Sequence, residues 1–226
     1  MKFEPNLNQE YSRVMKKLLT FLLLSIGFSS PAYSDDCFKE YLLASNSKNY
    51  DNAIKICKPL AQSGDVWAQE TLAGIYYESE NYKEALKWAK KAAEQGFAPA
   101  QLKVGLLYET GKGTLTNYKE AIKWYRKSAE QGNVVAQNNM GLMYEMGTGV
   151  LKDYKTSASW YQKAADGGSA FGQMNLGIYY CEGLGVKKDL AKSKSLLSKS
   201  YESGVLSPDQ QEFVEGIWER CNLANY

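Results

Sequence analysis

The sequence predicts an all-α protein, built as a stack of about five two-helix units and closed by a C-terminal helix. The first observation is a glycine that recurs every 36 residues, at Gly96, Gly132, Gly168 and Gly204. The second is that two aromatic series keep the same spacing, Trp88, Trp124, Trp160 and Tyr82, Tyr118, Tyr154. A fixed period of this length indicates stacked helical units, which form long open surfaces that usually bind other proteins.

The first helix of each unit is predicted from small and apolar residues spaced three and four apart. The three clearest copies are Ala100, Val104, Gly105, Tyr108, then Ala136, Met140, Gly141, Tyr144, then Gly172, Leu176, Gly177, Tyr180. This spacing places the four residues on one helical face, and the small residue allows a neighbouring helix to approach closely.

The second helix of each unit is predicted to begin at an asparagine or aspartate, because these side chains accept hydrogen bonds from unpaired backbone N–H groups. The expected starts are Asn81, Asn117, Asp153 and Asp189. Glu84 and Glu120 follow three residues later, which predicts capping boxes. Each second helix should end at the recurring glycine, in a left-handed conformation.

Between the two helices lies a Gly-x-Gly sequence, at residues 111–113, 147–149 and 183–185. A phosphate-binding loop would continue with Lys-Ser/Thr and would follow a strand, and this sequence does neither. A turn with unusual backbone angles is therefore the expected structure.

These signals divide the chain into repeats at residues 36–65, 66–97, 98–133, 134–169 and 170–205, with a cap helix at 207–221. In the first unit, Asn49 is the expected cap, and Pro59 should kink the second helix or loosen its hydrogen bonding. The last unit is followed by a helix without a partner, which is typical of a terminal cap.

The combined pattern resembles the Sel-one-like repeat family, whose members are relatives of the tetratricopeptide repeats. The resemblance covers residues 66–204 well and residues 36–65 weakly. Two departures are Ala73 at the first-helix glycine position of the second unit, and Leu196-Leu197 in place of Trp-Tyr in the fifth. The resemblance implies a right-handed α-solenoid that acts as an adaptor or scaffold, often as an exported bacterial protein.

Residues 1–34 carry the pattern of a secretory signal peptide, so we expect a periplasmic or secreted bacterial protein. A basic start at Met15-Lys16-Lys17 precedes an apolar run over 18–28 and the small-residue site Ala32-Tyr33-Ser34. The run is shorter than the roughly 20 apolar residues of a membrane span, which argues against an anchor. Residues 1–14 resemble a misassigned extension, with translation starting at Met15, and residues 35–226 would form a single solenoid domain.

Charge and composition argue against several functions. Residues 1–34 hold four of the 27 basic and two of the 25 acidic residues, so residues 35–226 have no net charge. No concentrated basic stretch indicates nucleic-acid binding or a polybasic membrane patch, and no stable membrane insertion is expected after signal cleavage. The chain contains no histidine, which removes the commonest general base and metal ligand. We predict no catalytic residue, no cofactor and no metal, and a protein that is not an enzyme.

The four cysteines suggest disulfides, because their number is even and the chain is expected to be exported. Cys37 and Cys57 lie on opposite arms of the first hairpin, and Cys181 and Cys221 end two helices that should stack. We therefore predict these two pairs among the three possible connectivities, as staples at the ends of the stack. Four reduced, buried thiols are the alternative.

By analogy with tetratricopeptide repeats, the first helices line the concave side, and their variable positions could bind a partner. The candidate residues are Trp67, Glu70, Tyr77, Leu102, Leu106, Glu109, Asn138, Leu142, Glu145, Phe171, Met174 and Ile178. Gly74 and Cys181 occupy two more of these positions. Leu106, Leu142 and Ile178 would form an apolar stripe along the groove. The alternative is that adjacent first helices partly cover the stripe.

The sequence thus favours an exported module that binds a protein or peptide of unknown identity on its concave face, in an oligomeric state that the pattern leaves open. The alternative is a β-lactam-binding or β-lactamase-like enzyme, as implied by the cysteine-rich members of the family. Those members carry a cysteine pair in every repeat, whereas the central repeats here carry none.

Overall fold

The computed structural model describes residues 32–47 and 49–223, and this part of the chain contains eleven α-helices, joined by turns and loops, and no strand. The helices are α2 (Ala32–Ser47), α3 (Asp51–Gln62), α4 (Val66–Glu78), α5 (Tyr82–Glu94), α6 (Ala98–Thr110), α7 (Tyr118–Glu130), α8 (Val134–Met146), α9 (Tyr154–Asp166), α10 (Ala170–Glu182), α11 (Leu190–Glu202) and α12 (Pro208–Arg220). None of the helices in these residues is long and apolar enough to cross a membrane. The predicted signal peptide lies almost wholly outside the described residues, and its expected cleavage site falls in the first turn of α2.

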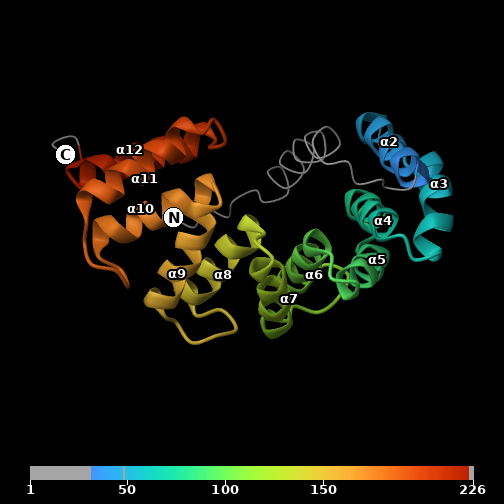
Figure 1. Ribbon diagram of the computed structural model, residues 1–226, viewed down its shortest axis with the longest axis horizontal. Helices are drawn as coiled ribbons and strands as arrows, with labels where there is room; N and C mark the ends of the chain where they lie inside the picture. Colours follow the sequence, from blue (N-terminus) through green and yellow to red (C-terminus); the bar gives the residue numbers. More distant parts are fainter. Residues whose placement is uncertain (1–31, 48, 224–226) are drawn as a thin grey trace.

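The helices form five consecutive pairs followed by α12, which confirms the predicted solenoid. Each helix packs against the next one in the chain, and first helices of neighbouring pairs also touch, as α2 with α4 and α8 with α10. The pairs follow an arc from α2 to α12, with α4 and α6 on its inner side and α5 and α7 on its outer side (Figure 1). The inner side is therefore built from first helices.

The second helices begin where the sequence predicts. The side chains of Asn81, Asn117, Asp153 and Asp189 each accept a backbone N–H from the first turn of α5, α7, α9 and α11. The predicted capping boxes are not formed, because Glu84 pairs with Lys87 at 3.1 Å and Glu120 with Lys123 at 3.7 Å. Among the described helices, a complete capping box is present at Ser207 and Gln210, where α12 starts.

Glycines close the turns as predicted. Gly96, Gly132, Gly168 and Gly204 have φ between 66° and 92° and follow the ends of α5, α7, α9 and α11. In the Gly-x-Gly loops, a Cβ on Gly113 would lie 2.2 Å from the carbonyl oxygen of Tyr82 in the preceding repeat. Each of these loops thus rests on the start of the second helix before it, a contact that only glycine permits.

Proline is accommodated inside α3, which runs without a break through Pro59 to Gln62. Asn49 does not occupy the N-cap position, which is Tyr50, but its side chain accepts the N–H of Asp51 at 3.3 Å.

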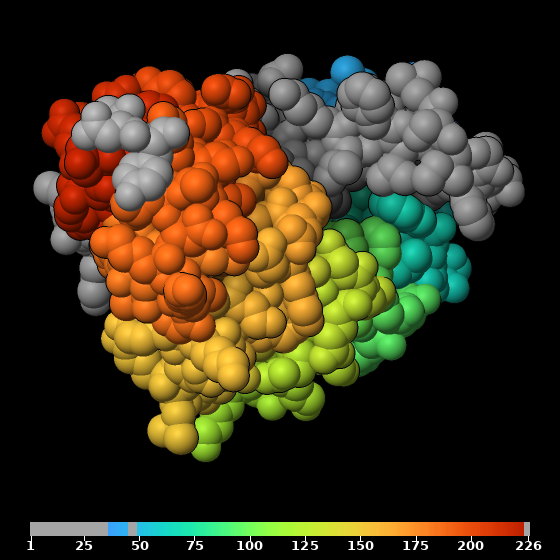
Figure 2. Space-filling model, turned by 60° about the vertical axis from the view of Figure 1, so that its left-hand side comes forward, coloured from blue at the N-terminus to red at the C-terminus, as the bar shows by residue number. Residues whose placement is uncertain are grey.

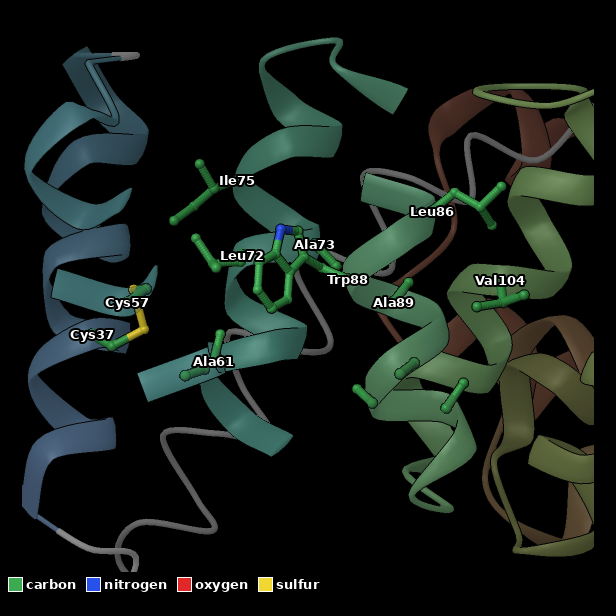
Figure 3. Close-up of a cluster of buried hydrophobic side chains, with 14 of the residues drawn as sticks. Cys37, Cys57, Ala61, Leu72, Ala73, Ile75, Leu86, Trp88, Ala89 and Val104 are labelled. Carbon is green, nitrogen blue, oxygen red and sulfur yellow. A yellow bond between two sulfur atoms is a disulfide. The ribbon is translucent and has the colours of Figure 1, made fainter. Parts of the chain in front are cut away.

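Close packing of glycine against tyrosine sets the distance between the two helices of a unit. A Cβ on Gly105 would lie 2.5 Å from the ring of Tyr125, and one on Gly141 would lie 2.4 Å from the ring of Tyr161. Both rings are completely buried. In the second unit, where Ala73 replaces the glycine, the tyrosine position holds Ala89, and both alanines are buried beside Trp88 (Figure 3). The larger residue on one helix is therefore matched by a smaller one on the other.

Two disulfides lie at the two ends of the solenoid, paired as the sequence predicts. Cys37 of α2 is joined to Cys57 of α3 with Cα atoms 4.8 Å apart, and Figure 3 shows this bond beside the core of the second unit. Cys181 of α10 is joined to Cys221, just after α12, with Cα atoms 6.0 Å apart. The second bond ties the cap helix to the last repeat.

Candidate partner-binding surface

The inner face carries one incompletely buried apolar side chain per repeat. Leu106, Leu142 and Ile178 follow the motif glycines of α6, α8 and α10 and are half-buried. The next residue in each helix, which is Leu107, Met143 or Tyr179, is at most 3% exposed. The fold therefore uses the second position after the glycine for its core and leaves the first partly open.

The neighbouring helices cover some of the other candidates. Glu70, Leu102, Asn138 and Phe171 are between 3% and 8% exposed. Glu70 of α4 forms an ion pair with Lys103 of α6 at 2.6 Å, and Asn138 of α8 accepts a hydrogen bond from Asn175 of α10 at 3.0 Å. These polar contacts join adjacent first helices across the inner face, and their burial makes them costly to break.

Glu109 and Glu145 have a structural role that was not expected from their positions in the repeat. Their carboxylates accept hydrogen bonds from the hydroxyls of Tyr125 and Tyr161, respectively. Burial, followed by the nearby carboxylate, raises the pKa of each tyrosine well above its ordinary value, so both hydroxyls remain protonated donors. The only signal in the sequence is that each pair is 16 residues apart in two consecutive repeats.

The remaining candidates lie near the two ends of the surface. Trp67 is 38% exposed and meets Phe97 edge-on, with ring centroids 4.7 Å apart. Tyr77 accepts a hydrogen bond from Lys112 at 3.3 Å. Met174 is half-buried and packs against the apolar cluster of the last repeat. Gly74 of α4 is half-buried as well.

Opposite charges are segregated between the two layers of helices, although residues 35–226 have no net charge. The inner helices α4, α6, α8 and α10 contain five glutamates and one lysine. The outer helices α5, α7, α9 and α11 contain thirteen basic and six acidic residues. The first helices are therefore acidic in composition and the second helices basic, which the net charge of zero does not reveal.

The outer face also repeats a contact between lysine and tryptophan. The ammonium groups of Lys91, Lys127 and Lys163 lie 4.2 to 4.4 Å from the ring centroids of Trp88, Trp124 and Trp160. The three tryptophans are at most 7% exposed. We therefore interpret the lysines that lie over their rings as part of the packing of the outer helices.

No constellation for metal chemistry accompanies these surfaces. Within the described residues, no three histidine, cysteine, aspartate or glutamate side chains are grouped so that they could hold a metal ion.

Fold and surface together define an α-solenoid of two-helix repeats with an open inner face. Sel1 repeats match residues 68–97, 98–133, 134–169 and 170–205, and the chain belongs to the Sel1 repeat family. Proteins of this family are generally non-catalytic modules for protein–protein interaction.

Three solved structures illustrate the likeness. A Sel1 repeat protein from Oxalobacter formigenes is 35% identical, with a TM-score of 0.65 over 73% of this chain and 69% of that one. A protective antigen of uropathogenic Escherichia coli strains, with an SLR fold, is 36% identical, with a TM-score of 0.67 over 74% of this chain and 38% of that one. A Sel1 repeat protein from Klebsiella pneumoniae shares the fold at 20% identity and a TM-score of 0.51, over 86% of this chain and 97% of that one. A search of curated proteins found no match.

Proposed function

We propose that this protein is an exported bacterial adaptor that holds a segment of a partner protein against its inner face. The observation that carries the proposal is the row of half-buried apolar side chains at Leu106, Leu142 and Ile178, one in each of three successive repeats. Partly open apolar groups repeated along a concave surface are typical of peptide-binding sites.

The charges of the inner face indicate what kind of segment would bind. Glu109 and Glu145 follow Leu106 and Leu142 by three residues in α6 and α8, and the four inner helices together contain five glutamates and one lysine. An apolar segment with basic flanks would complement this surface and would be repelled by the basic outer face. The polar bridges at Lys103 and Asn138 fix the spacing of the first helices, so the surface is organised before a partner arrives.

The two terminal disulfides support the export of the protein, because such bonds persist in oxidising compartments. The predicted signal peptide is consistent with a periplasmic or secreted location.

The test is a pull-down from cells after crosslinking, read by mass spectrometry. The test variant carries Leu106→Lys, Leu142→Lys and Ile178→Lys, which place three cations in the apolar row. The matched control carries Ser159→Lys, Ala191→Lys and Ser195→Lys, which add the same charge at exposed positions of α9 and α11. Both variants should first show wild-type helicity and thermal stability.

We expect the partner to be retained by the control and lost by the test variant. Equal retention by both variants would show that recognition lies elsewhere, and loss in both would show that added charge alone prevents binding. The β-lactamase-like alternative has its own test, because turnover of nitrocefin by the purified protein would require an enzymatic function.

A further inference from the structure

Two leucines at the tips of neighbouring loops are almost fully exposed. Leu115 lies between α6 and α7 and is 87% exposed, and Leu151 lies between α8 and α9 and is 91% exposed. They occupy equivalent positions, 36 residues apart, and the next repeat has Lys187 there. The fold therefore does not require leucine at this position, and these two are the most exposed large apolar side chains among the described residues.

The loops that carry these residues share one edge of the solenoid, and both reach the lower edge of the molecule in Figures 1 and 2. A Cβ on Gly149, in the loop of Leu151, would lie 2.8 Å from Cβ of Tyr118, which begins the helix just after Leu115. Gly185 rests in the same way on Tyr154. Residues 111–119, 147–155 and 183–191 thus form a continuous surface, which we call the loop edge.

The loop edge is rich in lysine. These three segments contain six lysines and two aspartates. The lysines at positions 119, 152, 155, 187 and 188 are exposed. Both aspartates, Asp153 and Asp189, accept backbone N–H bonds as helix caps. The loop edge therefore carries an excess of basic residues, which the fold assembles from three separated segments although no single stretch of the sequence is strongly basic.

We propose that the loop edge docks on the surface of an anionic lipid bilayer, with Leu115 and Leu151 entering the interface and the lysines contacting the headgroups. Apolar groups beside basic residues are the combination that binds peripheral proteins to anionic membranes. A bilayer accepts apolar side chains at any point of its surface, whereas a folded partner would need two pockets at the same spacing. This proposal is independent of the partner-binding function of the inner face.

Amide hydrogen exchange provides the test, because it reports which segment of the chain contacts the vesicle. A local readout is needed, since the full chain also contains the apolar run over 18–28, which could itself bind a membrane. The full chain is mixed with vesicles of phosphatidylglycerol and phosphatidylcholine in equal amounts, or of phosphatidylcholine alone. We expect slower exchange in residues 111–119 and 147–155 with the anionic vesicles only. Bound protein without protection of these segments, or equal protection on both kinds of vesicle, would overturn the proposal.

Vesicle binding by variants gives the second readout. The double change Leu115→Ser with Leu151→Ser should weaken binding to anionic vesicles about tenfold or more, whereas Leu43→Ser, at a 62% exposed leucine on α2, should not. The double change Lys119→Glu with Lys155→Glu should weaken binding to anionic vesicles at least about 25-fold. The control, Lys55→Glu with Lys58→Glu at exposed positions of α3, should not weaken this binding to the same extent. Equal effects of test and control variants, or no vesicle binding by the wild-type chain, would contradict docking through this edge.

Discussion

Replacing Gly105 by alanine should destabilise the protein, although alanine is the better helix former. The added Cβ would lie 2.5 and 2.6 Å from two carbons of the Tyr125 ring, against an optimum of roughly 3.5–4.0 Å, so the ring must move by about 1 Å. The ring cannot move easily, because it is completely buried and its hydroxyl is bonded to Glu109. Overpacking of this kind costs ~1–3 kcal/mol, which a helix-propensity gain of ~1 kcal/mol offsets only in part.

A double-mutant cycle isolates this clash. Tyr125→Ala alone should cost about 3–5 kcal/mol, because it empties a buried site. In that background Gly105→Ala should become stabilising by about 1 kcal/mol, since the obstacle has gone, which reproduces the pair found at Ala73 and Ala89. The sign of the alanine effect therefore reverses between the two backgrounds.

The assay is urea unfolding followed by circular dichroism, with Gly216→Ala as the control. Gly216 is an exposed glycine of α12 whose added Cβ would meet no atom within 4 Å, so alanine there should stabilise by about 1 kcal/mol. If Gly105→Ala stabilised the wild-type background as much as Gly216→Ala does, the packing argument would be refuted.

Three further predictions concern the ends and the buried tyrosines. The double change Cys181→Ser with Cys221→Ser removes a disulfide that closes a loop of 40 residues, and it should lower the free energy of unfolding by about 4 kcal/mol. Amide exchange in α12 should become faster. Unchanged exchange in α12 would show that helix packing alone holds the cap helix in place. The pKa values of Tyr125 and Tyr161 are raised above 10 in the folded state, so as the pH rises above 10 the unfolded state loses these protons first and the free energy of unfolding should fall. Each Tyr→Phe variant should lose less stability over this pH range than the wild-type protein does. An identical pH profile of stability in variant and wild type would refute the assignment of this loss to the buried tyrosines. Glu78→Gln weakens the bonds from Tyr41 and Tyr50, at 2.5 and 2.6 Å, and should cost ~1–2 kcal/mol in thermal unfolding, whereas Glu80→Gln, at an exposed turn, should change little.

The period of the repeat was sufficient to predict the fold. The recurring glycines and the asparagine or aspartate caps act locally, through backbone angles and a few hydrogen bonds, so their effect can be inferred from sequence. The predicted capping boxes were wrong for an equally local reason. A neighbouring lysine competes for the glutamate, as Lys87 does for Glu84.

The inner face was harder to predict, because its side chains are arranged by contacts between repeats. Leu102 and Asn138 occupy positions that the motif leaves variable, yet adjacent first helices bury them. Glu109 was expected only to line a groove, and its bond to Tyr125 depends on how two helices of one unit face each other. Sequence spacing places a residue on a helix face, but the separation and rotation of the helices decide what that face meets.

The most direct test of the proposed adaptor function is photo-crosslinking from single positions in living cells. Benzoylphenylalanine replaces Leu142 on the inner face in one strain and Ser159 on the outer face in another. Binding of a partner on the inner face predicts a crosslinked partner from position 142 and none from position 159. A partner captured from position 159 and not from position 142 would contradict binding on the inner face.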